Sequence, residues 1–374
     1  MQDQDRLRLA FLADPNSPHT RRWLAYFAER GHEVHLLNGF ATPVAPGLHA
    51  GIIVQDYAAH GAWRLPFFSS LQGRSALRRA LEPLHPHVLH AHYLTRYGWQ
   101  ARLSGFHPYV VSPWGSDLFV TPRRSWRART WARTTLSSAD LVTVVSEPMR
   151  QAAISSGARP DRIESIQFGV DTRRFAPAPA RDGLARRLGL GDRKVIYSAR
   201  ALRPIYNQEI VIDAFARLPP DTVLILTARN ADPAYLARVR AQIDELRIAD
   251  RVRILDEVPD ADLPDLLRLA ALVVSVPASD GFPVSVLEAM ASGTPVVATD
   301  LPPIRPVLGP MAEDLLVPVG DRDALAAALR GAMNLEPARR AALATAMREY
   351  AVRVADYATN MERMEALYRR LSEH

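Results

Sequence analysis

The chain has 374 residues, of which 48% are hydrophobic and 23% charged, so its composition is that of a globular protein and excludes wholesale disorder. At about 100–200 residues per domain, this length indicates two domains. The sequence contains no cysteine, which excludes disulfides, zinc–thiolate sites, iron–sulfur clusters and cysteine nucleophiles.

The net charge is +6, and Lys194 is the only lysine among 46 basic residues. Phosphate contacts must therefore come from guanidinium or backbone N–H groups. No apolar run approaches the ~20 residues that span a bilayer. The start of the chain, residues 1–5, is acidic and lacks the positive stretch of a signal peptide. We therefore expect a cytoplasmic protein, either soluble or peripheral on the inner face of the membrane.

Short apolar runs alternate with helix-length amphipathic segments, which predicts parallel sheets covered by helices. The strand-like runs of the first half are 7–13, 33–37, 51–54, 88–91, 109–112, 141–145 and 162–166. A stretch rich in proline and alanine, 175–183, predicts an extended linker. Strand-like runs resume at 194–198, 223–227, 252–255, 272–276 and 295–298, and the chain past residue 321 turns helical.

The last segment, 357–371, is predicted to be an amphipathic helix, because its apolar residues recur at spacings of three and four. The predicted fold class is therefore α/β, with two Rossmann-like βαβ domains that face each other across a cleft. The predicted boundaries are 1–170 for the first domain and 171–355 for the second. Residues 356–374 are predicted to form a C-terminal helix that packs back on the first domain.

The loop after the run 272–276 is the first place to look for a site, because ligands bind beyond the carboxyl ends of strands in an open parallel sheet. Gly281 permits a tight turn there, and Pro283 suits the first turn of a helix. The helix start at Phe282, Pro283 and Val284 presents free N–H groups and the positive end of a dipole, which favours an anion.

Two carboxylates flank this helix start, Asp280 before it and Glu288 inside the helix. Both can accept hydrogen bonds from sugar hydroxyls. The competing interpretation is that Asp280 only caps the helix and that Glu288 faces solvent.

This stretch resembles the acidic signature of the retaining glycosyltransferases of family 4 (glycosyl transferases group 1), which have the GT-B fold. Their pattern is Glu-Gly-x-x-x-x-x-x-Glu followed by Ala-Met-Ala-x-Gly-x-Pro-Val-Val, and Asp280 stands where the first Glu usually does. The matching residues are Gly281, Glu288, Ala289, Met290, Ala291, Gly293, Pro295, Val296 and Val297. Four more segments resemble family motifs in order and spacing, namely 90–93, 115–117, 140–146 and 169–177.

The resemblance implies that the second domain binds a nucleotide-sugar donor. Glu288 would bind the ribose hydroxyls, and Asp280 would contact hydroxyls of the donor hexose. The N–H groups from Gly281 to Val284 would meet the phosphate or the sugar. Val258 would lie near the nucleobase, which the family recognises largely through backbone contacts.

Arg200, just after the run 194–198, matches a family arginine that neutralises the diphosphate leaving group. The family's lysine, about five residues later, is missing, and Tyr206 or Asn207 stands there. Charge on the leaving group would then rest on Arg200, on the helix start and on Arg203, whose competing interpretation is a solvated loop arginine. This departure leaves the identity of the donor open.

The first domain would bind the acceptor. Trp114 stands before Gly115, where many relatives have a histidine, and an indole can stack on a sugar or acceptor ring but cannot act as a base. Ser116 and Asp117 follow in a Gly-Ser-Asp motif of the family. Two histidines are also candidates for this acceptor or cleft group: His92 at a strand end, and His19 at a helix start, where it contacts either acceptor, phosphate or water.

We expect no metal and no cofactor. Residues 260–262 have the Asp-x-Asp form of metal-binding glycosyltransferases, but those have a different fold, and acidic residues here favour the start of a helix. His90 and His92 lie two apart on a strand and share one face, but no third ligand is identified.

The predicted function is a retaining glycosyltransferase that moves a hexose-type sugar from a nucleotide-diphosphate sugar to a glycan or a lipid-linked acceptor. The alternatives are a sugar-nucleotide epimerase of GT-B-like fold and a non-catalytic sugar-nucleotide binder, which the absent lysine favours. A nucleic-acid partner is not expected, because no recognition helix or RNA-binding motif accompanies the positive charge.

An anionic membrane surface is a further candidate partner. Residues 122–133 contain five arginines and two tryptophans but no acidic residue. A second such stretch, 63–79, contains Trp63, Phe67, Phe68, Arg74, Arg78 and Arg79. Basic helices that carry aromatic residues lie on anionic lipid. The competing interpretation is an ordinary solvated helix with Trp126 buried.

Overall fold

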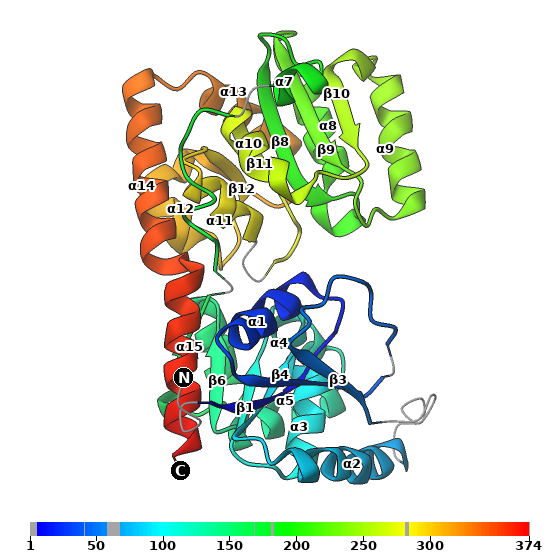
Figure 1. Ribbon diagram of the computed structural model, residues 1–374. Coiled ribbons are helices and arrows are strands. Elements are labelled where there is room, and N and C mark those ends of the chain that lie inside the picture. The colour runs from blue at the N-terminus through cyan, green and yellow to red at the C-terminus, as the bar shows by residue number, and fades with distance from the viewer. Residues whose placement is uncertain are drawn as a thin grey trace. The chain divides into compact units, whose positions relative to one another are not determined.

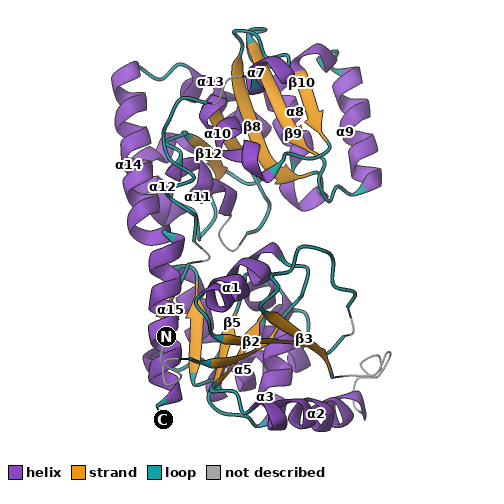
Figure 2. Cartoon of the chain, in the orientation of Figure 1, coloured by secondary structure: helices purple, strands orange, loops and turns teal. Residues whose placement is uncertain are grey.

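The computed structural model describes residues 6–40, 42–57, 68–167, 169–180, 183–280 and 284–373. The chain divides into two compact units, one formed by Met1–Phe168 with Ala358–His374 and the other by Gly169–Tyr357. Each unit contains one parallel sheet with helices around it (Figures 1 and 2). The predicted fold class, two Rossmann-like α/β units, is confirmed.

The first unit contains a seven-stranded sheet in the order β3-β2-β1-β4-β5-β6-β7. Its strands are β1 (Arg8–Leu12), β2 (Glu33–Asn38), β3 (Ile52–Asp56), β4 (Val88–His92), β5 (Tyr109–Ser112), β6 (Leu141–Val144) and β7 (Ile163–Ser165). Its helices are α1 (Pro18–Glu29), α2 (Phe68–Leu81), α3 (Trp99–Ser104), α4 (Ser116–Phe119), α5 (Trp126–Ser138), α6 (Glu147–Ser155) and α15 (Tyr357–Ser372). All seven strand-like runs of the first half are strands.

The second unit contains a six-stranded sheet in the order β10-β9-β8-β11-β12-β13. Its strands are β8 (Lys194–Ala201), β9 (Thr222–Thr227), β10 (Val252–Leu255), β11 (Ala270–Ser275), β12 (Val296–Thr299) and β13 (Leu316–Val317). Its helices are α7 (Leu184–Arg187), α8 (Gln208–Ala216), α9 (Pro233–Glu245), α10 (Leu263–Leu269), α11 (Val284–Ala291), α12 (Arg305–Ala312), α13 (Arg322–Met333) and α14 (Pro337–Ala355). Sequence patterning misses β13, because two residues before Pro318 are too few to show a period.

Local sequence explains the elements. Strands β6 and β12 are runs of apolar and small residues that are buried throughout, as expected for parallel strands covered on both faces. Several helices begin at a side-chain cap: Ser17, Ser125 and Ser146 each accept the N–H of the residue three positions on.

Both sheets have the same topology. In each, the first strand of the unit lies between its second and fourth strands, so β1 neighbours β4 and β8 neighbours β11. At this point the direction of winding reverses, and the connections leave the two adjacent strands on opposite faces of the sheet. A crevice for ligands forms at such a switch point, at the carboxyl ends of the strands. The topology therefore marks one candidate site in each unit.

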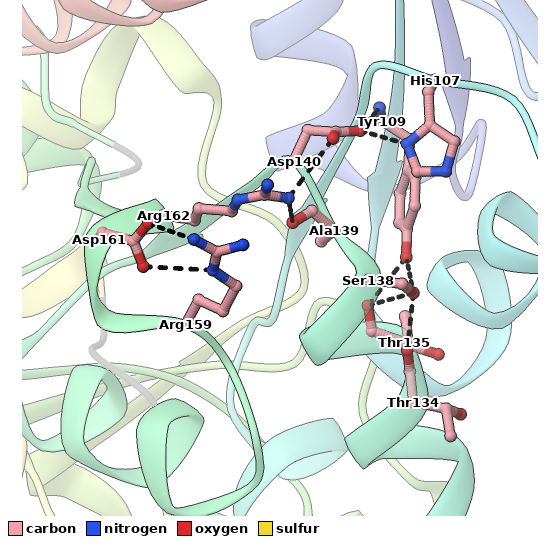
Figure 3. Close-up of polar contacts among 10 residues, drawn as sticks. All are labelled: His107, Tyr109, Thr134, Thr135, Ser138, Ala139, Asp140, Arg159, Asp161 and Arg162. Carbon is pink, nitrogen blue, oxygen red and sulfur yellow. Dashed lines mark hydrogen bonds and ion pairs between the residues drawn. The ribbon is translucent and has the colours of Figure 1, made fainter.

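The C-terminal end of α5 is tied to the sheet (Figure 3). The hydroxyl of Tyr109 on β5 donates to the carbonyl of Thr135 at 2.9 Å and lies 2.6 Å from Ser138 Oγ. Asp140 follows the helix, accepts the N–H of Tyr109 at 2.8 Å and pairs with Arg162 at 3.6 Å. These contacts hold α5 in a defined orientation against the sheet.

Two connections link the units, after residue 168 and after residue 357. They meet in a parallel bridge in which Val170 N–H donates to Ala355 O at 2.7 Å and Tyr357 N–H donates to Val170 O at 2.9 Å. Gly169 has a φ of 75°, and a Cβ there would lie 2.5 Å from the Tyr357 Cα. Only glycine fits this close approach.

Beyond this bridge, α15 belongs to the first unit. Its Glu365 pairs with Arg30 at the end of α1 at 2.6 Å and lies 3.2 Å from His32. Its Tyr368 is fully buried. The predicted C-terminal helix thus packs back on the first sheet and its α1.

Candidate functional site

The switch point of the second sheet brings Arg200 and Asp280 together. Arg200 lies near the end of β8, and Asp280 lies in the loop after the neighbouring strand β11. The Arg200 Nη2 atom lies 2.5 Å from Asp280 Oδ2, and the two side chains are only 12% and 17% exposed. Two residues 80 positions apart in the sequence therefore form a shielded ion pair.

An irregularity in β8 sets the direction of Arg200. The register of β8 against β9 shifts between Ser198 and Ala201. Such a bulge re-aims the side chains beside it. The Arg200 guanidinium carbon lies 4.2 Å from the centre of the Tyr206 ring. Its Nε atom is buried and makes no hydrogen bond to any described residue. The Nε–H group can therefore donate a hydrogen bond to a ligand.

The turn that carries Tyr206 is fastened to the loop that carries Asp280. Ala278 N–H donates to Ile205 O at 2.9 Å, and Asn207 Nδ2 donates to Val276 O at 3.0 Å. Asn207 has a φ of 52°, a conformation that asparagine tolerates better than most residues. The predicted donor residue Asn207 is thus used to join the two loops.

Glu288 lies half-buried on α11. Burial and, second, the Glu288 carboxylate raise the pKa of Tyr197 on β8, which places Glu288 near the strand that carries Arg200. Val284 is the first residue of α11. Gly281, Phe282 and Pro283, which sequence analysis assigns to the donor site, lie outside the described residues.

The other two predicted donor residues lie on neighbouring loops. Arg203 is exposed, and its Nε donates to the carbonyl of Asn230, in the loop after β9, at 2.9 Å. Val258 is half-buried in the loop after β10. Arg203 therefore stabilises a loop at the carboxyl edge of the same sheet.

The switch point of the first sheet gathers three of the predicted acceptor residues. His19 follows β1, His92 ends β4 and Trp114 follows β5, and these three strands are consecutive in the sheet. The Trp114 ring centre lies 5.0 Å from that of His92 and 5.9 Å from that of His19. Trp23 completes the cluster at 5.3 Å from His92. Trp23 is not among the residues predicted from the sequence, although its spacing of four from His19 places both on one helix face.

Both histidines of the cluster are held neutral. Burial and, second, Arg22 lower the pKa of His19 to about 4. Burial and, second, His19 lower the pKa of His92 to about 3. His92 is 1% exposed, and its Nε2 makes no hydrogen bond to any described residue. A buried neutral imidazole is a weak base, but it can donate a hydrogen bond to a hydroxyl through one nitrogen or accept one through the other.

His90, two residues before His92, takes part in a buried chain of hydrogen bonds. Trp23 Nε1, which can only donate, lies 3.3 Å from the Tyr368 hydroxyl. Tyr368 therefore donates its own proton to His90 Nδ1. The proton of His90 then resides on Nε2, which donates to Ser112 Oγ at 2.7 Å. This hydrogen-bonded chain connects α1, α15, the middle of β4 and the end of β5.

Asp117 holds the loop after β5 from inside. It is fully buried, and its carboxylate accepts the backbone N–H groups of Leu94, Trp114 and Gly115 at 2.6, 3.0 and 2.9 Å. Burial raises the pKa of Asp117 to about 6, against the opposing effect of these hydrogen bonds. Asp117 thus positions Trp114 and is not exposed to a ligand.

Gly115 and Ser116 complete this loop. Gly115 has a φ of 136°, which an L-residue with a side chain rarely adopts. Ser116 is exposed, and its Oγ lies 2.7 Å from the Tyr93 hydroxyl. Of the Gly-Ser-Asp motif, only the serine side chain therefore reaches the surface.

The Asp-x-Asp segment forms ion pairs at the start of α10. Asp260 lies 2.8 Å from Arg174, and Asp262 lies 2.6 Å from Arg187. In the described ranges, no group of three or more His, Asp or Glu side chains has the arrangement of a metal site.

The surface of α5 is aromatic and basic. Trp126 is 71% exposed and Trp131 is 37% exposed, so the interpretation of Trp126 as buried is wrong. Five exposed arginines surround them: Arg123, Arg124, Arg127, Arg129 and Arg133. In the second basic stretch, Arg74, Arg78 and Arg79 are exposed on α2, whereas Trp63, Phe67 and the side chain of Phe68 lie outside what the structure describes. Among the described helices, none is both long and apolar enough to cross a membrane.

Two family models match the chain. Glycosyl transferase 4-like matches residues 8–146, and Glycosyl transferases group 1 matches residues 182–352. A GDP-mannose-dependent alpha-(1-6)-phosphatidylinositol monomannoside mannosyltransferase from Mycolicibacterium smegmatis is 31% identical over 268 residues, which is 67% of each chain. The chain belongs to the group 1 glycosyltransferases of family 4.

Other relatives match this glycosyltransferase over shorter lengths. A D-inositol 3-phosphate glycosyltransferase from Jonesia denitrificans is 30% identical over 48% of the chain and 45% of the relative. A phosphatidyl-myo-inositol mannosyltransferase from M. smegmatis is 35% identical over 46% of the chain and 43% of the relative. The chain thus matches less than half the length of these two proteins.

Solved structures share the fold over nearly the whole glycosyltransferase. A sucrose-phosphate synthase from Thermosynechococcus elongatus superposes with a TM-score of 0.82 at 20% identity, covering 98% of this chain and 99% of that one. HepE from Anabaena, in complex with UDP, superposes with a TM-score of 0.81 at 21% identity, covering 98% and 100%. These likenesses establish the GT-B fold.

Proposed function

We propose that this glycosyltransferase moves a hexose-type sugar, with retention of configuration, from a nucleotide-diphosphate sugar held by the second unit to a hydroxyl of an acceptor held by the first. The observation that carries the proposal is the Arg200–Asp280 pair at the switch point, beside a buried Arg200 Nε that bonds to no described residue. A guanidinium suits a diphosphate, and a carboxylate suits sugar hydroxyls.

In the proposed reaction the acceptor oxygen bonds to the anomeric carbon, and the bond from that carbon to the diphosphate oxygen breaks. The acceptor proton passes to the departing phosphate oxygen on the same face. Arg200 stabilises the charge that develops on the leaving group, and Glu288 holds the ribose. The contribution of the protein is positioning and electrostatic stabilisation, and no side chain is assigned as a general base.

The relatives suggest substrates to test. One is named for GDP-mannose and a phosphatidylinositol mannoside, and another for D-inositol 3-phosphate. We propose a cyclic polyol acceptor, either free or lipid-linked, whose ring face lies on the Trp114 indole. We also propose that α5 contacts an anionic membrane surface, which would suit a lipid-linked acceptor.

The donor site is tested by measuring sugar transfer from GDP-mannose and from UDP-glucose to inositol-type acceptors. Arg200→Ala and Glu288→Gln are expected to reduce turnover by roughly 100-fold or more, with melting temperatures near the wild-type value. Arg240→Ala, at an exposed position on α9, is the matched control. NMR of the product decides retention, and EDTA is expected to leave turnover unchanged because Arg200 takes the place of a metal. Near-normal turnover of both site variants would overturn the proposed site.

One observation favours a second candidate function. Arg200 is already paired with Asp280, and the sequence has no lysine at the family's position after it, so a non-catalytic sugar-nucleotide binder is the alternative. It predicts tight donor binding without transfer to any acceptor. Donor conversion without an acceptor would instead indicate an epimerase.

A further inference from the structure

Arg200 is the basic residue of this segment that we expect to meet the diphosphate, because the other basic residues near it in sequence are engaged elsewhere or remote. Arg203 donates to Asn230 O. Lys194 begins β8, six residues earlier, and at about 3.3 Å per residue it lies near the opposite edge of the sheet. An arginine side chain is long and flexible, so its guanidinium stays in one place only if neighbours hold it.

Two groups hold it in different ways. Asp280 pairs with the Nη2 edge of the guanidinium at 2.5 Å. Tyr206 lies 4.2 Å from the guanidinium carbon, within the range in which a ring attracts a cation. A ring that attracts the cation leaves the in-plane N–H groups available for hydrogen bonds, whereas a carboxylate occupies them.

The backbone turn that carries Tyr206 is held by several hydrogen bonds. Tyr206 ends the short turn Pro204–Tyr206, whose N–H to carbonyl bond from Tyr206 to Arg203 measures 3.0 Å. The Ala278–Ile205 and Asn207–Val276 hydrogen bonds fasten this turn to the Asp280 loop on both sides of the tyrosine. The turn that carries the ring therefore stays attached to this loop when the Asp280 side chain changes partner.

We propose that Tyr206 is a positioning residue that holds the Arg200 guanidinium in place when a donor draws Asp280 away to its sugar hydroxyls. The inference rests on the proposed function. The ring keeps the N–H edge of Arg200 directed at the diphosphate, including the Nε that bonds to none of the described residues. Its effect is largest in the transition state, where the leaving group gains charge, so it acts on kcat more than on KM.

The test compares substitutions at position 206. Tyr206→Phe keeps the ring and is expected to retain kcat within about twofold, whereas Tyr206→Leu is expected to lower kcat roughly 10-fold. The KM for the acceptor should stay unchanged in both. Tyr350→Leu is the matched control, since Tyr350 is also half-buried in the second unit with an arginine, Arg353, 5.8 Å from its ring.

A second measurement does not depend on how well Tyr206→Leu folds. Fluorinated phenylalanines at position 206 withdraw electron density from the ring face with little change in size, so log kcat should fall stepwise with each fluorine. A flat series, or equal rates for Tyr206→Phe and Tyr206→Leu, would overturn the role of Tyr206. If Arg200→Ala remained active, the proposed function itself would fail, which separates the two outcomes.

Discussion

The Arg200 guanidinium contacts both the Asp280 carboxylate and the Tyr206 ring, and the contact with Asp280 should weaken diphosphate binding. A diphosphate must compete with Asp280 for the same guanidinium. Side-chain burial of the pair, at 12% and 17% exposed, makes that competition stronger than at an open surface.

Asp280→Asn removes this competition. We expect the variant to bind free UDP or GDP more tightly, roughly 3-fold or more, because the guanidinium loses its anionic partner. Sugar transfer should nevertheless slow, because the amide accepts hydroxyl hydrogen bonds less strongly than a carboxylate. Calorimetric titration with both nucleotides checks the affinity. Weaker nucleotide binding by Asp280→Asn would contradict the assignment.

His92 makes the first unit sensitive to acid. Because its pKa is lowered from 6.5 to about 3, the unfolded chain takes up the proton first, and stability is lost as the pH falls from 6.5 towards 3. Relative to His92→Leu, the wild type should lose free energy of unfolding in this window, by up to roughly 1.4 kcal/mol per pH unit. Above pH 7 the difference should be constant.

Urea unfolding at pH 8, 6 and 4.5 measures this difference. His49→Leu serves as the control, because the His49 side chain is 36% exposed. A difference between wild type and His92→Leu that does not change with pH would show that His92 is not held neutral by burial.

At the scale of single elements, α5 illustrates how a helix is anchored on one side and exposed on the other. Ala132, Thr135 and Leu136 are buried, while Trp126, Trp131 and the arginines around them face outwards. Hydrogen bonds to Tyr109 fix the helix at its C-terminal end (Figure 3). This is the arrangement of a helix that meets a charged surface with one face.

If α5 meets a membrane, the wild type should float with vesicles that contain anionic lipid and not with neutral ones. Each arginine near such a surface contributes about 1 kcal/mol. Trp126→Ala combined with Arg127→Glu and Arg129→Glu is therefore expected to lower the bound fraction at least about tenfold. Arg240→Glu, on α9, should float like the wild type. Equal flotation of the α5 variant and the wild type would exclude α5 as the contact.

At the scale of the whole molecule, the chain passes twice between its units, and the bridge between Val170 and Asp356 joins the two passages. Thr172 Oγ1 also donates to Asp356 Oδ2 at 2.7 Å. Gly169 allows this approach because it has no side chain.

Gly169→Ala is expected to lower the free energy of unfolding by about 2–4 kcal/mol, since it adds strain at positive φ and a clash with the Tyr357 backbone. Gly191→Ala separates the two causes. Gly191 also has a positive φ, of 59°, but nothing lies within 4 Å of its added Cβ, so strain alone should cost about 1 kcal/mol. If thermal unfolding showed that Gly169→Ala and Gly191→Ala lose the same free energy of unfolding, the contact with Tyr357 would be unimportant.

Local sequence was enough to predict most of the fold. Runs of apolar residues predicted all strands except β13, and the 280–297 signature indicated the family, because strand burial, helix caps and turn residues act over a few neighbouring positions. The rule that ligands bind after strand ends selected the loop that carries Asp280. Arg200 and Trp114 were selected through the resemblance to the family.

Only the tertiary structure decided which of these residues meet and what each does. The pairing of Arg200 with Asp280 depends on β8 lying beside β11 and on a bulge in β8, neither of which leaves a local pattern. The burial of Asp117, the exposure of Trp126 and the placement of Tyr206 under a guanidinium likewise depend on residues far along the chain. Sequence periodicity reports the face of an element that is covered, whereas partners across a sheet are set by strand order and packing.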